Sequence, residues 1–329
     1  MAEVTVAAPA HTPAAAADNA AFHRMLFIAM AGVLVVLPFI PVIGYPFFLM
    51  KVLCFALFAC AFNLMLGYGG LLSFGHAAYF GLASYVSAYT AKHWGLTPEL
   101  AILFGTASGA VLGLIFGSLA IRRQGIYFAM ITLALAQMVY FFSLQAPRFT
   151  GGEDGIQAVP RNKVLGLLPL SNDLVTYYLV AVIFVAGVML IYRIIHSPFG
   201  QVLKAIRDNE ARAVSLGYRV NQYKLAVFVL SASLAGLAGA TKAIAVQLAS
   251  LTDVHWSMSG EVVLMTLVGG MGTVFGPIVG AAVIISMQNF LAGLGDWVTI
   301  LQGIIFVICV LVFREGVVGV IGKWLKKPL

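Results

Sequence analysis

The residues of this chain best suited to polar chemistry gather in one segment, residues 197–217. Five charged residues lie within nine positions of that segment: Lys204, Arg207, Asp208, Glu210 and Arg212. Guanidinium and carboxylate groups can form charge-assisted hydrogen bonds with a partner surface. Ser197 followed by Pro198 favours a helix start, and Gly217 favours a helix stop. We therefore predict one amphipathic helix whose charges can bind a partner.

The kind of partner follows from the side chains of this segment. A helix that lies on lipid headgroups favours Lys, Arg and bulky apolar residues. Here Asp208 and Glu210 are interleaved with the basic residues, and the apolar residues Val202 and Val214 are of modest size. This composition favours docking against a protein. The alternative, in which the charges only solvate a loop, remains open from the residues alone.

A second group of polar residues lies inside long apolar runs, where contact with lipid would be costly. Each of these residues is a candidate for a transport pathway or for a hydrogen bond between helices: Asn63, Ser73, His76, Thr132, Gln137, Gln247, Glu261 and Gln288. Ser73 and His76 follow the pair Gly69-Gly70, which favours a break in the helix at this point. Such breaks line pathways because their freed backbone groups cannot face lipid.

The Gly-rich segment at 69–81 resembles a second segment at 269–280. Both place paired glycines and a Phe-Gly step inside an apolar run, and the second contains Gly269, Gly270 and Thr273. Duplicated halves with broken helices are common in transporters. We therefore add these three residues to the pathway candidates. The alternative is that two Gly-Gly pairs coincide by chance, and the pattern leaves open whether the breaks are re-entrant or kinked.

Four further glycines recur at intervals of four residues: Gly105, Gly109, Gly113 and Gly117. This spacing places them on nearly one face of a helix, where another helix can approach closely. We predict that the stripe packs against a helix of this subunit or of another.

Motifs of catalysis are absent from the sequence. No GxxxxGK[ST] phosphate loop is present, since the Gly322-Lys323 pair is followed by Trp and lacks the upstream glycine. The sequence also lacks GxSxG and HExxH motifs, and its three cysteines have no metal-type spacing. We expect no enzymatic activity, metal or cofactor in this chain, and any ATP and Mg²⁺ to be used by a separate ATPase.

The elements that must position these residues are membrane helices. Hydrophobic residues make up 61% of the 329 residues and charged residues 9%, too few to cover a soluble protein. About 20 apolar residues cross a bilayer. On this basis we predict an all-α polytopic fold of eight to ten helices, near residues 25–43, 46–66, 72–91, 99–121, 125–144, 174–195, 225–249, 260–291 (broken) and 297–313.

The flanking segments and the charges complete this organisation. Residues 1–22 are rich in Ala and Pro and predict a disordered tail; residues 23–318 form the transmembrane domain and 319–329 a basic tail. Of 19 Lys and Arg residues, 13 fall on the side of both termini, which predicts cytoplasmic termini. The net charge of +7 thus indicates topology and not nucleic-acid binding. The outer loop 145–173 predicts either contact with a binding protein or a cap on the bundle.

Several motifs resemble ABC importer permeases of the branched-chain amino-acid family. The resemblance is carried by AIRDNE at 205–210, the glycine-rich run at 224–239, and the motifs at 63–76, 150–155 and 269–277. The TGGEDG loop at 150–155 is more similar to the LivM type of subunit than to LivH. The resemblance implies that 197–217 is a coupling helix for an ATPase, although Glu210 and Gly217 are seven residues apart where the wider importer motif has six.

The resemblance also implies a function and partners. The expected function is alternating-access import of branched-chain or hydrophobic amino acids across a bacterial inner membrane. Expected partners are a LivH-like permease, two ATPase subunits, an extracytoplasmic binding protein and the lipid bilayer. A related permease for urea, short amides or aromatic acids would look similar. An ion-coupled secondary transporter is a further alternative, which leaves the 197–217 segment without a purpose.

Overall fold

A computed structural model of the chain describes residues 13–39, 45–164, 168–170 and 172–291, together with ten single positions between 293 and 319. All structural statements below refer to these residues. The span predicted at 297–313 and the basic tail predicted at 319–329 lie outside them, apart from some of the single positions.

The described residues form twelve α-helices. Their bounds are α1 (Pro13–Val36), α2 (Pro46–Asn63), α3 (His76–His93), α4 (Pro98–Ala120), α5 (Ile126–Gln145), α6 (Pro147–Thr150), α7 (Asp173–Ile195), α8 (Pro198–Asp208), α9 (Glu210–Ser215), α10 (Val220–Val246), α11 (Trp256–Gly269) and α12 (Gly276–Leu291). Proline at the first turn of α2, α4 and α8 suits a helix start, because its fixed backbone angle is already helical and its missing N–H would have no partner there.

Short elements complete the fold. A turn of 3₁₀-helix, η1 (Leu37–Phe39), follows α1, a π-helical turn, η2 (Leu64–Tyr68), extends α2, and a 3₁₀ turn, η3 (Leu251–Asp253), precedes α11. The strands are β1 (Ile156–Gln157), β2 (Lys163–Val164), β3 (Leu168–Pro169) and β4 (Leu248–Ala249). They pair antiparallel as β1 with β4 and β2 with β3, with Ile156 opposite Ala249 and Lys163 opposite Pro169.

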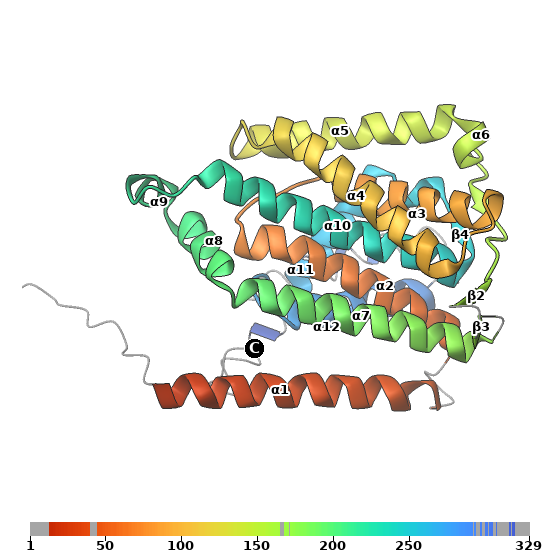
Figure 1. Cartoon of the computed structure of the whole chain (residues 1–329), viewed down its shortest axis with the longest axis horizontal. Coiled ribbons are helices and arrows are strands. Elements are labelled where there is room, and N and C mark those ends of the chain that lie inside the picture. The colour runs from red at the N-terminus through yellow and green to blue at the C-terminus, as the bar shows by residue number, and fades with distance from the viewer. Residues whose placement is uncertain are drawn as a thin grey trace, which may run out of the picture.

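The long helices run side by side along one direction (Figure 1). Helices α8 and α9 lie at one end of this bundle, and the four strands lie at the other. We call these the α8 end and the strand end. Helix α2 is central, since it packs against α7, α10, α11 and α12. In its most apolar stretch of 18 residues, 83% of the residues are buried inside the protein.

Five helices are long and apolar enough to cross a membrane: α2 with η2, α4, α5, α7 and α10. The prediction of an all-α polytopic membrane protein is thereby confirmed. The run at 260–291 forms two antiparallel helices, α11 and α12, of 14 and 16 residues, joined by a turn at 270–275. Helix α3 begins at His76 instead of residue 72, because residues 70–75 are extended or bent.

The first helix begins at Pro13, inside the segment predicted as a disordered tail. The segment predicted as a tail is thus helical from Pro13. Its alanines favour helix strongly, although the segment lacks an apolar face.

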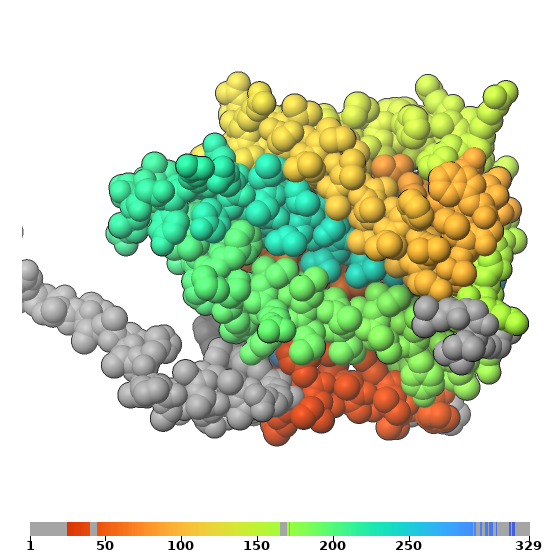
Figure 2. All heavy atoms as spheres, viewed as in Figure 1, coloured from red at the N-terminus to blue at the C-terminus, as the bar shows by residue number. Residues whose placement is uncertain are grey.

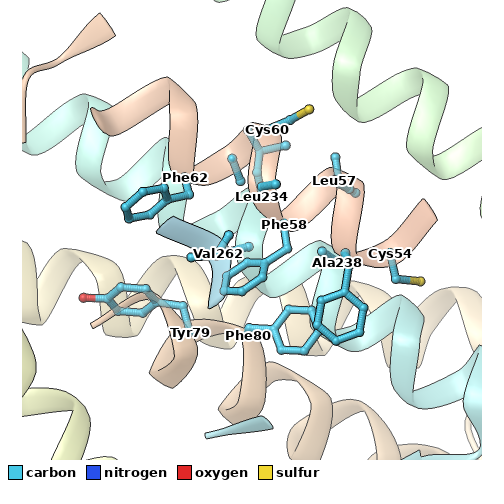
Figure 3. Close-up of a cluster of buried hydrophobic side chains, with 14 of the residues drawn as sticks. Cys54, Leu57, Phe58, Cys60, Phe62, Tyr79, Phe80, Leu234, Ala238 and Val262 are labelled. Atoms are coloured by element: carbon cyan, nitrogen blue, oxygen red, sulfur yellow. The ribbon is translucent and has the colours of Figure 1, made fainter. Parts of the chain in front are cut away.

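The core lies where α2, α3 and α10 meet (Figure 3). Phe58 and Phe80 face each other there with ring centroids 4.6 Å apart. Helix α10 approaches α3 closely at Gly239, where an added Cβ would lie 2.7 Å from the Phe80 carbonyl carbon and 3.0 Å from its Cα. Cys54 and Cys60 are buried free thiols, as expected for small core residues.

The glycine stripe of α4 faces α10. An added Cβ at Gly105 would meet Ala240, at Gly109 the backbone of Ala232 and Gly236, at Gly113 Ala232, and at Gly117 Phe228 and Leu225. The structure thus places the stripe against a helix of the same chain, and α4 and α10 form the most extensive helix pair of the fold.

Candidate functional site

The segment predicted as one helix at 197–217 is two helices, α8 and α9. The break is at Asn209, whose backbone is extended (φ −159°, ψ 98°). Its side-chain oxygen accepts a hydrogen bond from the Arg212 N–H and so caps α9. The prediction of a continuous helix is wrong because Asn stabilises a helix start more than a helix interior. Gly217, at φ +86°, ends α9 as predicted from its conformational freedom.

One face of this segment packs on the bundle and the other is exposed. Leu203 and Ile206 of α8 are buried, and Ile206 forms a small apolar cluster with Ala213 and Val220. On the outer side Val214 is 56% exposed and Leu216 is 70% exposed. Figure 2 shows that the segment projects from the α8 end of the molecule. The exposed apolar residues at its tip form a surface of the kind that another protein covers.

Arg207 fastens α8 to the end of α2. One guanidinium nitrogen donates a hydrogen bond to the Gly67 carbonyl oxygen, and another pairs with Asp208 at 3.2 Å. Carbonyl groups at a helix C-terminus carry partial negative charge and lack partners within the helix, so a guanidinium is well placed there. The Cγ of Arg207 also packs against Gly70.

Glu210 fastens α9 to two other parts of the bundle. Its carboxylate accepts a hydrogen bond from Lys224 Nζ at 2.8 Å and another from Gln124 Nε2 at 2.9 Å. Lys224 is the fifth residue of α10, and its side chain is only 7% exposed, whereas that of Glu210 is 32% exposed. Arg207 and Glu210, predicted to face an ATPase, are therefore held by contacts within the chain.

The other charged residues of the segment differ in their surroundings. Lys204 lies over the ring of Tyr68, with Nζ 5.5 Å from the ring centroid. Burial against the bundle, together with the nearby charge of Arg207, lowers the pKa of Lys204 from its ordinary value. Arg212 and Asp208 are exposed. These two, with Val214 and Leu216, form the outward-facing part of the segment.

Asn63, the last residue of α2, joins this helix to the second Gly-rich segment. Its side-chain amide donates to the Thr273 carbonyl oxygen at 2.8 Å, and its side-chain oxygen accepts from the Gly272 N–H at 2.9 Å. Thr273 Oγ1 donates to the Gly270 carbonyl oxygen at 2.8 Å, and Gly269 packs against Gly276 across the turn. Four predicted pathway residues thus form one junction between α2 and the turn from α11 to α12, with the Arg207 guanidinium alongside Gly272.

The remaining pathway candidates are not part of this junction. Ser73 and His76 are fully buried. The Ser73 hydroxyl oxygen accepts a hydrogen bond from the Gly75 N–H, and His76 Nε2 lies 2.8 Å from Ser231 Oγ. Gln137 is half-buried on α5. The structure therefore places Ser73 and His76 inside the packed core.

At the strand end, the outer loop covers the ends of several helices. Lys92 Nζ donates to the Gln157 carbonyl oxygen at 2.8 Å, and Arg161 bonds Asp173 and the Ala245 carbonyl oxygen. These contacts favour the alternative in which the loop caps the bundle. Below it, Lys242 and Asp253 form a buried ion pair at 2.6 Å, with side chains 7% and 4% exposed.

The sequence interpretation missed the residues that hold the 197–217 segment against the bundle. Lys224 was counted only as a topology signal, and Gln124 was not considered. Glu210 and Lys224 are 14 positions apart and on different helices, so helical spacing cannot reveal their contact. A lysine at the start of an otherwise apolar helix was the available signal, since a buried ammonium group requires a partner.

A bundle of apolar helices, five of them long enough to cross a bilayer, defines an integral membrane protein. The sequence profile described as the branched-chain amino acid transport system permease component matches residues 45–311. The chain belongs to this family of permeases.

Named relatives agree with this assignment at low identity. The chain is 24% identical to the high-affinity branched-chain amino acid transport permease protein LivM of Salmonella typhimurium and to that of Escherichia coli, over 94% of this chain and 79% of each relative. It is also 24% identical to the fructose import permease protein FrcC of Rhizobium meliloti, over 75% of this chain and 68% of the relative. No solved structure matches the chain.

Proposed function

We propose that this protein is the LivM-like permease subunit of an ATP-driven importer for branched-chain or hydrophobic amino acids. The observation that carries the proposal is the family match over residues 45–311, with LivM relatives aligned along 94% of the chain. The ATP would be hydrolysed, with Mg²⁺, by two separate ATPase subunits. A LivH-like permease and an extracytoplasmic binding protein would complete the complex in a bacterial inner membrane, with both termini of this chain cytoplasmic.

The coupling step follows from the contacts of α8 and α9. An ATPase subunit would dock on the exposed tip formed by Val214 and Leu216, and ATP-driven closure would displace the segment. Arg207 would transmit this displacement to the end of α2, and through the Asn63 junction to the turn between α11 and α12. Glu210 would transmit it to α10 through Lys224. Alternating access would result from the relative movement of these helices.

A relative named for fructose import aligns with 75% of the chain, so the test of the cargo includes solutes of several classes. Uptake should therefore be measured in vesicles containing the whole complex, with leucine, isoleucine and valine as substrates. Urea, short amides, aromatic acids and fructose serve as competitors. Uptake that persists without the ATPase and disappears when ionophores collapse the ion gradient would refute the proposal in favour of a secondary transporter.

The docking surface can be tested separately by purification of the complex from membranes in mild detergent. Leu216→Asp places a charge on the exposed tip, where the subunit itself needs no apolar residue. We expect loss of the ATPase from the complex with unchanged stability of the permease. Thr252→Asp, at an exposed position of η3 at the strand end and outside the membrane-crossing helices, is the control for a surface charge. Equal recovery of the ATPase with Leu216→Asp and wild type would rule out this docking surface.

A further inference from the structure

A cavity lies between the end of α4 and the start of α10, and both of these helix ends lie toward the α8 end of the bundle (Figure 1). Both helices are long and apolar enough to cross a membrane, so the cavity lies at the ends of two spans. It has a volume of about 240 Å³ and is lined by Gly117, Ser118, Ile121, Arg122, Asn221 and Leu225.

The polar side chains of this lining suit an anion that also carries a hydroxyl group. Among the described residues, neither the Arg122 guanidinium nor the Asn221 side-chain amide has a hydrogen-bond or ion-pair partner. A guanidinium matches the oxygens of a phosphate group. Ser118 Oγ donates its own proton to the Ile115 carbonyl oxygen at 2.8 Å. The serine therefore offers the cavity acceptor lone pairs, which suit a hydroxyl donor.

The charges around the cavity also favour an anion. Arg123 directly follows the lining residue Arg122, and Arg219 is the N-cap residue of α10; both are exposed. An acidic residue at the same end, Glu210, is already paired with Lys224 at 2.8 Å. A negatively charged group in the cavity is thus attracted by several arginines.

An apolar surface continues from the cavity along α4 toward the strand end. Leu114 and Ser118 are four residues apart, so they lie on one face of the helix. Val111, Leu114 and Ile115 are each at least 50% exposed. On a membrane-crossing helix, such residues contact acyl chains. A ligand with its phosphate in the cavity and its chains on this surface is a phospholipid, whereas a soluble phosphate compound leaves the apolar surface unused.

We propose that this cavity binds the headgroup of phosphatidylglycerol from the leaflet at the α8 end. Arg122 and the Asn221 amide donate hydrogen bonds to the phosphate, and a hydroxyl of the headgroup glycerol donates to Ser118 Oγ. Basic pockets between membrane helices bind anionic headgroups by the same charge complementarity. A choline headgroup has no hydroxyl donor and its lipid has no net charge, so phosphatidylcholine binds less well. The site is independent of the cargo and of the ATPase.

The test measures the dissociation constant of phosphatidylglycerol by native mass spectrometry of the purified full chain. The chain is held in a nonionic detergent with about 0.15 M ammonium acetate, which screens exposed charges beyond about 8 Å. Arg122→Gln should weaken binding about tenfold or more, as for loss of hydrogen bonds to a charged group. Ser118→Trp keeps every charge but fills the cavity, and should weaken binding to a similar extent.

Arg123→Gln is the matched control. It removes the same charge from the adjacent exposed residue, which is outside the cavity lining, and should weaken binding about twofold or less. Because Ser118 and Arg122 are exposed, neither substitution should alter the thermal stability of the lipid-free protein. Two further ligands complete the experiment. Phosphatidylcholine should bind about tenfold more weakly than phosphatidylglycerol, and soluble glycerol 3-phosphate should not displace the lipid.

The possible outcomes separate the explanations. Equal losses in Arg122→Gln and Arg123→Gln would reduce the effect to general attraction by a basic end and would overturn the site. Wild-type affinity in Ser118→Trp would contradict the cavity as the place of binding. Displacement by glycerol 3-phosphate, or equal binding of phosphatidylcholine, would refute phosphatidylglycerol as the ligand. If Arg122→Gln binds the lipid normally but loses the ATPase on purification from membranes, the arginine contacts a protein and the lipid site is wrong.

Discussion

The close contact between α10 and α3 at Gly239 gives a sharp prediction about stability. Replacing Gly239 by Ala adds a Cβ that would lie 2.7 Å from the Phe80 carbonyl carbon and would overlap the carbonyl oxygen of the same residue. These are backbone atoms of a second helix, so the clash cannot be relieved by turning a side chain. The two helices would have to separate locally by more than an ångström before the added Cβ and the Phe80 carbonyl oxygen reach ordinary van der Waals contact.

The expected change in the free energy of unfolding for Gly239→Ala is the difference between two opposing effects. Overpacking of a well-packed core costs about 1–3 kcal/mol, and this site belongs at the upper end because backbone must move. Ala is favoured over Gly inside a helix by about 1 kcal/mol. In a membrane the packing of helices depends on van der Waals contact and gains little from the hydrophobic effect. We therefore expect Gly239→Ala to destabilise the protein by about 2 kcal/mol.

Gly260→Ala is the matched control. Gly260 lies inside α11, and an added Cβ there meets nothing within 4 Å. The same substitution should leave stability unchanged or raise it by up to about 1 kcal/mol. The free energy of unfolding can be measured by SDS titration in mixed micelles, with fluorescence of the four tryptophans as the signal. If Gly239→Ala is as stable as Gly260→Ala, α10 does not contact the backbone of α3 as closely as described.

Three other predictions use the same unfolding assay. Lys242→Met should lower the free energy of unfolding by about 3–5 kcal/mol, because it leaves the buried Asp253 carboxylate without its ion-pair partner. The double change Lys242→Met with Asp253→Leu should recover most of this loss. If it does not, the unpaired carboxylate is not the cause of the lost stability. Glu210→Ala should destabilise the protein more than Lys224→Met. The first variant leaves Lys224, 7% exposed, without its partner, whereas the second leaves Glu210, which is 32% exposed and can be rehydrated. The opposite order would contradict the burial of these side chains. Asn63→Leu should lower the free energy of unfolding by about 2–4 kcal/mol, because it leaves the Gly272 N–H and the Thr273 carbonyl without partners. If stability is unchanged, as expected for Leu216→Asp, the junction does not hold α2 to the turn.

The helical architecture was largely predictable from the sequence. Runs of about 20 apolar residues leave few alternatives to membrane helices, and the starts of α2, α4 and α8 follow from proline at the first turn. The first part of helix α1 was the exception, because its residues are rich in Ala and lack the apolar periodicity of a packed helix. The break at Asn209 was predictable in principle, since the residue type favours a cap.

The contacts of the candidate site were not predictable in the same way. The charged residues at 204–212 identified the segment, but their sequence did not show which of these side chains face outward. Asn63 and Thr273 are 210 positions apart, and their hydrogen bond depends on how α2 packs against α11 and α12. The two Gly-rich motifs were noticed as similar sequences, whereas the structure brings Gly67, at the end of α2, against Gly272 in the second motif. Such contacts follow from tertiary packing and not from local pattern.

The two attachments on either side of Asn209 have a mechanical consequence. Arg207 fixes α8 to the end of α2, and Glu210 fixes α9 to the start of α10 and to Gln124 before α5. Only Asp208 and Asn209 lie between these two attachments, which connect the segment to two groups of helices. A sliding of one group past the other must be taken up by rotation about the backbone of Asn209, the one extended residue between them. If that rotation is blocked, the two groups can shift only by breaking one of the attachments.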